Sequence, residues 1–436
     1  MRRTASAKDL VFVYALNQST HWFVIGLMFP VLVLVILDKG INIFQAGIAI
    51  AAYSATTIAL EIPTGGMADI IGRKRVYVIS LGFLFLAGLA LLLSWDFLTV
   101  MTAVVLNGAA RALSSGTIDA WFVDEFKRRN PQGNLQESLA RAGIFIPAGI
   151  GLGSLVGGVL PEVSDNIGIS GWGFGPYALN LLAFMAAILV QLLLTQLFIV
   201  EIHERDSSGG RAISVKGLSD QVTTAVRFGV KNRIVLILLI AVIALGFGLS
   251  SVELLWQPRV QQILGNSTET WILGVLAAGY FFSSSIGNWL SAPTCRLLKN
   301  DYLVALSLLR VAVALSLLLL ALQEGILGFA LLYFVMFFFN GVSDSPHATL
   351  FNNQVPSNAR STLLSFQSVM LQLGGLCGSL VIGFVAKVYS IPSAWTLAAV
   401  VLLISSVTYL VLTSTRFRPS TQPGACVQTP SDAFDR

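Results

Sequence analysis

Long uncharged runs of apolar residues recur about twelve times along the 436-residue chain. A bilayer core is roughly 30 Å thick and a helix rises about 1.5 Å per residue, so a run of about 20 residues can cross it. The pattern predicts an all-α membrane protein with twelve spans: Leu10–Leu37, Phe44–Gly66, Val76–Trp95, Phe97–Val123, Leu139–Leu160, Pro176–Val200, Ile234–Trp256, Thr270–Cys295, Tyr302–Gln323, Gly325–Pro346, Thr362–Ala386 and Pro392–Thr415.

The longest polar segment, Glu201 to Lys231, divides the spans into six plus six. Within it Val215, Leu218, Val222 and Val226 recur at helical spacing, which suits either a helix lying on the anionic inner leaflet or a solvated linker helix. We therefore predict a first six-helix bundle over residues 1–200, a cytoplasmic linker over 201–231 and a second bundle over 232–416. A disordered polar tail is predicted over 417–436.

The composition excludes a soluble protein. Apolar residues make up 55% of the chain and charged residues only 11%, with a mean hydropathy of +0.78, whereas a soluble domain carries about 25% charged residues. The three cysteines are far apart and form no metal-ligand spacing, so neither a metal nor a cofactor is predicted. The sequence also lacks a Walker nucleotide-binding loop, so any uphill process must draw on an ion gradient.

Basic residues indicate the orientation of the chain. Most of the 27 Lys and Arg residues fall in segments on one side of the predicted spans, and the other side holds only Lys39, Arg259 and Lys387. Cytoplasmic loops carry this excess in membrane proteins, so both termini are predicted to be cytoplasmic. The sequence pI near 9.2 then reflects topology, and we predict no nucleic-acid partner.

A glycine-rich basic loop stands between spans two and three and reads Gly-Gly-Met-Ala-Asp-Ile-Ile-Gly-Arg-Lys-Arg over residues 65–75. Glycines suit a tight turn between two helices, and the basic residues suit the inner membrane face. The loop resembles the corresponding loop of the major facilitator superfamily, whose members are transporters with two pseudo-symmetric six-helix bundles. The resemblance implies that Asp69, Arg73 and Asp124 form a cytoplasmic charge cluster that holds one conformation of the transporter.

Two further stretches, residues 115–124 and 353–362, resemble one bacterial branch of the same superfamily. Drug–proton antiporters of the superfamily also carry an Arg in the middle of span four, which Arg111 matches, and a proline-glycine signature on span five, which Pro147 matches in part. The resemblance implies alternating access and places spans one, four, seven and ten around a central cavity.

Polar residues inside the spans are the candidates for that cavity, because a charged group in hydrocarbon costs at least about 2.5–3.5 kcal/mol unless it finds water or a partner. On span four, polar side chains recur every four residues, which predicts one wet helix face. The predicted cavity residues are His21, Asn17, Asn107, Arg111, Asn340 and Asp344. A structural role for His21, headgroup contact for Glu253 and Asp344, and snorkelling of Arg310 to the surface are the simpler alternatives.

Coupling to an ion gradient requires a titratable group. A carboxylate in a low-dielectric cavity binds its proton more tightly than in water, so proton and substrate can compete for it. Asp119, on span four with Arg111, is the first candidate for proton coupling, and Glu61 is the second. Glu61 is equally well interpreted as a structural partner of the loop after span two.

These observations predict a secondary transporter in the plasma membrane that exports an amphipathic drug-like or metabolite substrate in exchange for protons, as a monomer in the lipid bilayer. An importer or facilitator of the same fold is the main alternative, and a non-transporting receptor is another. A membrane-embedded enzyme is not expected, because the three histidines lie in separate regions of the sequence.

Overall fold

The computed structural model describes residues 7–169, 175–201, 232–265, 269–355 and 360–414, and within these ranges it contains helices and no strands. The first half consists of α1 (Ala7–Met28), α2 (Leu32–Asp38), α3 (Ile43–Ile71), α4 (Arg73–Leu92), α5 (Phe97–Ser114), α6 (Thr117–Arg129), α7 (Leu135–Gly143), α8 (Phe145–Asn166) and α9 (Ala178–Phe198). The second half consists of α11 (Arg233–Ile263), α12 (Trp271–Leu297), α13 (Tyr302–Ala321), α14 (Ile326–Gln354), α15 (Arg360–Val388) and α16 (Ile391–Ser414).

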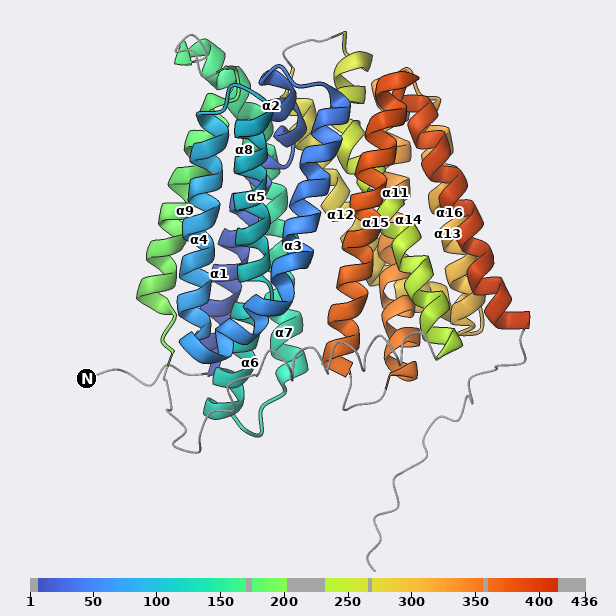
Figure 1. The fold of residues 1–436 in the computed structure, drawn as a ribbon. Helices are drawn as coiled ribbons and strands as arrows, with labels where there is room; N and C mark the ends of the chain where they lie inside the picture. The colour runs from blue at the N-terminus through green and yellow to red at the C-terminus, as the bar shows by residue number, and fades with distance from the viewer. Residues whose placement is uncertain (1–6, 170–174, 202–231, 266–268, 356–359, 415–436) are drawn as a thin grey trace, which may run out of the picture.

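The two halves lie side by side as bundles of roughly parallel helices (Figure 1). We call the end at which α1 begins and α16 ends the basic end, because it carries the basic runs 73–75 and 127–129; it is the lower end in Figure 1. The other end is called the opposite end. The predicted all-α architecture of two six-span halves is confirmed, whereas the predicted linker helix and tail lie outside the described residues.

Eleven segments of the described chain are long and apolar enough to cross a membrane. The predicted span that falls outside this set is α12, which carries three consecutive serines over 283–285 and Asn288. Asn288 is exposed, and Ser285 Oγ donates to the Phe281 carbonyl of its own helix over 2.8 Å. Further along α12, Ser291 Oγ donates to the Val342 carbonyl of α14 over 2.8 Å, so α12 obtains a polar partner from a neighbouring helix.

Span four, which the sequence pattern predicts as one helix, is broken. α5 ends at Ser114, and Gly116 adopts a left-handed φ of 69° before α6 begins at Thr117. A residue with a Cβ is strained at such an angle, so glycine permits the break. The expected single wet face from Asn107 to Asp119 is therefore interrupted at Ser115 and Gly116, between the end of α5 and the start of α6.

Glycines of α8 allow close approach of neighbouring helices. A Cβ placed on Gly149, Gly153 or Gly157 of α8 would collide with backbone carbonyls of α1. On a neighbouring face of α8, a Cβ on Gly158 would lie only 2.5 Å from the Cα of Gly274 in α12. Small residues allow such backbone contact between membrane helices, here both within the first half and between the halves.

Hydrogen bonds join the two halves at the opposite end. Gln257 of α11 accepts from the Val33 amide over 3.0 Å and donates to the Phe29 carbonyl over 2.6 Å. Nearby, Thr270 Oγ1 donates to the Gly158 carbonyl over 2.7 Å. The halves are therefore tied together at the end remote from the basic loops.

Candidate functional site

A cavity of about 460 Å³ lies between the two halves and takes side chains from both. A second cavity of about 290 Å³ adjoins it and shares Phe29, Tyr53, Asn107 and Glu253 among its lining residues. Aromatic side chains form much of the wall of the larger one: Trp22, Phe29, Tyr53, Tyr280 and Phe281. A concave, largely apolar site with a few polar groups is the usual form of a small-molecule site.

The first half supplies the basic side of the larger cavity. Arg111, His21 and Asn107, three of the residues expected in a substrate cavity, line it. The Arg111 side chain is accessible from the cavity, and its charge acts on His21 as well as on Glu61. This side therefore offers hydrogen-bond donors and one permanent positive charge.

A hydrogen-bond relay fixes the orientation of His21. Gln191 Nε2 donates to Tyr77 Oη over 2.9 Å, and Tyr77 Oη lies 3.1 Å from His21 Nδ1. Because the tyrosine oxygen accepts from Gln191, its own hydrogen is free to go to Nδ1, which places the proton of a neutral imidazole on Nε2. Tyr77 and Gln191 are positioning residues that the sequence pattern did not reveal.

The second half contributes one carboxylate, that of Glu253, and it lines both cavities. No other acidic side chain is found among the residues that line either cavity. Glu253 thus faces the cavities between the halves, and α11 continues to Ile263, well past the predicted end at Trp256. An acidic residue within the apolar run of α11 was the signal that could have identified it.

Three other predicted cavity residues lie elsewhere. Asn17 is buried, and its Nδ2 donates to Thr195 Oγ1 of α9 over 3.0 Å, so it joins helices within the first half and does not line the cavity. Asn340 and Asp344 of α14 are not among the lining residues either. Asp344 is exposed, and its charge acts on the cavity residue Tyr280.

Asp119 lies in the first turn of α6, and its side chain is exposed, contrary to the burial expected from an unbroken span four. Its Oδ1 accepts from Tyr14 Oη over 2.6 Å and from Gln18 Nε2 over 2.5 Å, both on α1. The residue is not part of the cavity lining.

Glu61 of α3 lies between the halves. Its Oε1 accepts from Ser368 Oγ of α15 over 3.5 Å, while its Oε2 is buried without a partner among the described residues. It is therefore a contact across the interface, closer to the basic end than the hydrogen bonds of Gln257.

At the basic end, Arg73 pairs with Asp124 as the resemblance implied. The sequence did not reveal Glu201, whose carboxylate accepts from the amides of Arg73 and Lys74 over 2.8 and 3.1 Å. It thus caps the N-terminus of α4, where a negative charge is favoured. Lys74 Nζ in turn donates to the carbonyl of Ile199 over 2.6 Å, just past the end of α9. The side chain of Asp69 lies outside the described residues.

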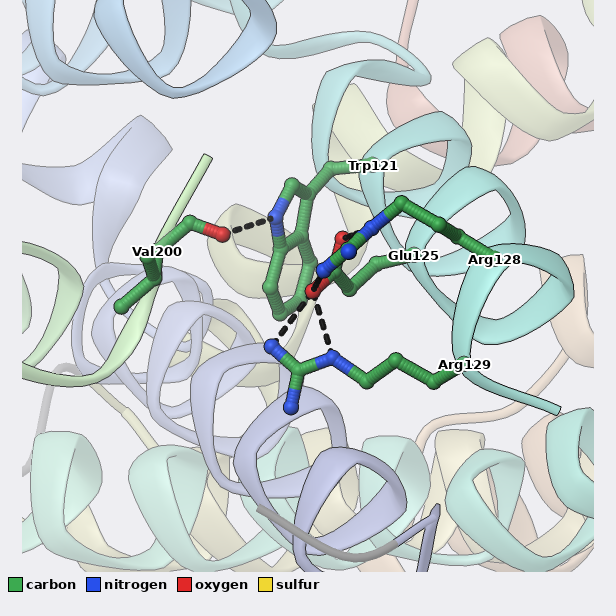
Figure 2. Close-up of polar contacts among 5 residues, drawn as sticks. All are labelled: Trp121, Glu125, Arg128, Arg129 and Val200. Carbon is green, nitrogen blue, oxygen red and sulfur yellow. Dashed lines mark hydrogen bonds and ion pairs between the residues drawn. The ribbon is translucent and has the colours of Figure 1, made fainter. Parts of the chain in front are cut away.

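α6 is tied to the same region (Figure 2). Trp121 Nε1 donates to the carbonyl of Val200 over 3.2 Å, and Glu125 pairs with both Arg128 and Arg129 on its own helix. The buried Glu125 carboxylate therefore has two cationic partners, and α6 is anchored next to the Glu201 cap.

Comparison with known proteins agrees with this architecture. The chain is 24% identical over 380 residues to the quinolone resistance protein NorA of Staphylococcus aureus, a match that covers 87% of this chain and 90% of NorA. It resembles a crystal structure of a mutant of the nucleoside transporter NupG with a TM-score of 0.75, at 13% identity and over 92% of this chain and 99% of that chain. A bacterial homologue of the human lysosomal transporter Spinster, in an inward-facing and unoccupied conformation, matches with a TM-score of 0.67, at 13% identity and over 94% of this chain and 96% of that one.

The model of the Major Facilitator Superfamily matches residues 11–346. This match extends over more than half of the chain and includes the glycine-rich loop, the broken span four and most of the second half. The chain is a multi-pass membrane transporter and belongs to the Major Facilitator Superfamily.

Proposed function

We propose that the protein exports an aromatic, amphipathic small molecule from the cell in exchange for protons. The observation that carries the proposal is the central cavity, whose aromatic wall has Arg111 and His21 on one side and the Glu253 carboxylate on the other. Relatives named quinolone resistance proteins support export of such a compound, because removal of a quinolone from the cell would confer resistance.

The proposed orientation places the basic end in the cytoplasm, in keeping with the excess of Lys and Arg there. With this orientation, the hydrogen bonds at the opposite end close the cavity to the outside, and the structure represents an inward-facing state. Glu61 then lies in the interface that must rearrange when the inner side closes.

Cysteine labelling tests the orientation. In a variant without the native cysteines, Ser208→Cys is expected to be protected from a membrane-impermeant maleimide added to intact cells, and Lys39→Cys is expected to be labelled. Labelling of Ser208→Cys before cell lysis, with Lys39→Cys protected, would reverse the proposed orientation.

Transport by inverted membrane vesicles tests the function. With an acidic vesicle interior, a fluorescent quinolone is expected to accumulate inside, and collapse of the pH gradient with an ionophore is expected to release it. A one-unit gradient is worth about 1.4 kcal/mol, or about tenfold accumulation for one proton per substrate. Vesicles without the protein provide the control, and radiolabelled uridine tests the importer alternative. Accumulation of either compound only with an acidic exterior would contradict export.

The proposed coupling residue is a carboxylate, and three candidates remain: Asp119, Glu61 and Glu253. The geometry favours Glu253, since it is the acidic side chain of the cavity lining, whereas Asp119 is exposed and held by α1. We propose that Asp119 and the Arg73–Asp124 pair instead hold α6 against the first half at the basic end.

A further inference from the structure

We propose that the second half contains a binding site for a small monovalent anion of the halide class, formed by Arg310, Tyr409 and His347. These residues come from α13, α16 and α14 and lie outside both described cavities. Arg310 lies eight residues after the start of α13, which corresponds to about 12 Å along the helix axis.

Arg310 does not snorkel to the surface. Its side chain is turned into the bundle, and the residue is only 6% exposed. Its Nη2 donates to Tyr409 Oη over 3.2 Å, and the guanidinium carbon lies 5.9 Å from the centre of the Tyr409 ring. Tyr409 is fully buried, and Ser307 Oγ, one turn before Arg310 on α13, donates over 3.2 Å to the carbonyl of Ser406, one turn before Tyr409 on α16. The guanidinium is therefore held at a fixed junction of helices.

The hydrogen-bond directions leave two donors at this junction. An arginine can only donate, so Tyr409 Oη accepts from Arg310 and directs its own hydrogen to His347 Nδ1, which lies 3.4 Å away. A neutral His347 then carries its proton on Nε2. Among the described residues, neither Arg310 Nη1 nor His347 Nε2 has a partner, and both atoms are buried.

The charge of the site points to an anion. No carboxylate of the described residues forms an ion pair with Arg310, although burial of an unpaired guanidinium is strongly destabilising. Two free donors and one net positive charge call for an acceptor that is itself negative. Since Tyr409 is completely buried and Arg310 almost so, the acceptor must be small, which favours a single ion such as chloride over a lipid headgroup.

Thermal unfolding of the purified protein tests the site. When chloride replaces gluconate at constant ionic strength, the unfolding midpoint is expected to rise and then saturate, because an ion that binds only the folded state stabilises it by mass action. Arg310→Met removes the charge and keeps much of the volume, so this variant is expected to lose the chloride-dependent rise. Arg141→Gln, which removes a surface charge of α7, is the matched control and is expected to retain it.

Two further measurements keep the test decisive if Arg310→Met fails to fold. Tyr409→Phe breaks the link between Arg310 and His347 and is expected to raise the chloride concentration at half-saturation. Crystals grown in bromide are expected to show an anomalous peak within hydrogen-bond distance of Arg310 Nη1 and His347 Nε2. No saturable chloride effect on the wild type, or no bromide peak, would overturn the proposal. A rise produced by phosphatidylglycerol nanodiscs and not by chloride would also overturn it and assign the donors to a lipid phosphate.

Discussion

Glu253→Gln is expected to abolish proton-driven accumulation of substrate while leaving downhill exchange intact. Glutamine keeps the size and polarity of the side chain but cannot titrate, and Glu253 is the acidic side chain that lines both cavities. With a one-unit pH gradient in inverted vesicles, the wild type is expected to accumulate quinolone about tenfold. The variant is expected to reach no more than the outside concentration.

Asp119→Asn and Glu61→Gln are the matched comparisons, because each also replaces one carboxylate by its amide. Both are expected to retain gradient-driven accumulation, with Asp119→Asn weakening the contacts of α6 with Tyr14 and Gln18. If Glu253→Gln accumulates substrate like the wild type and Asp119→Asn does not, the sequence-based assignment of Asp119 is the correct one. Exchange of labelled for unlabelled quinolone shows in each case that the variant is folded and binds.

Gly158→Val is expected to reduce transport severely by separating α8 from α12. A Cβ at this position would lie 2.5 Å from Gly274 Cα and 2.6 Å from Gly274 N, and these backbone atoms cannot move without their helix. Overpacking of this kind costs about 1–3 kcal/mol, which corresponds to a shift of about 5- to 150-fold in a conformational equilibrium. The variant should therefore favour states in which the opposite end is open.

Labelling of a cysteine at position 33 measures that shift. Val33 is only 2% exposed at the closed opposite end, so Val33→Cys should react slowly with a maleimide alone and much faster together with Gly158→Val. Gly82→Val is the matched control, since a Cβ on this α4 residue meets nothing within 4 Å. Equal labelling rates in the two glycine variants would contradict a conformational role for the Gly158–Gly274 contact.

The helical type and the number of the membrane spans could be predicted because a helix needs about 20 predominantly apolar residues to cross the bilayer. Helix ends were less predictable. α11 and α14 continue to Ile263 and Gln354, well past the predicted ends at Trp256 and Pro346, because a helix does not stop where its hydropathy falls.

The candidate site was predicted in part. Arg111 and His21 line the cavity, whereas Asn17 faces α9 and Asp119 lies beyond a break that the four-residue spacing concealed. Periodicity gives the face of one continuous helix, and it cannot show which neighbour covers that face or where a single glycine ends the helix. The cap that Glu201 places on α4 was also beyond sequence reasoning, because it joins residues more than a hundred positions apart.

The polar character of α12 has a consequence for biosynthesis. During synthesis α12 leaves the ribosome before α14, the helix that accepts the hydrogen bond of Ser291 and packs against Gly287. A segment with three serines and an asparagine near its middle gains less from entering lipid alone than the segments around it. Stable insertion of α12 is therefore expected to wait until α14 has been translated, which makes the second half assemble as a unit late in membrane integration.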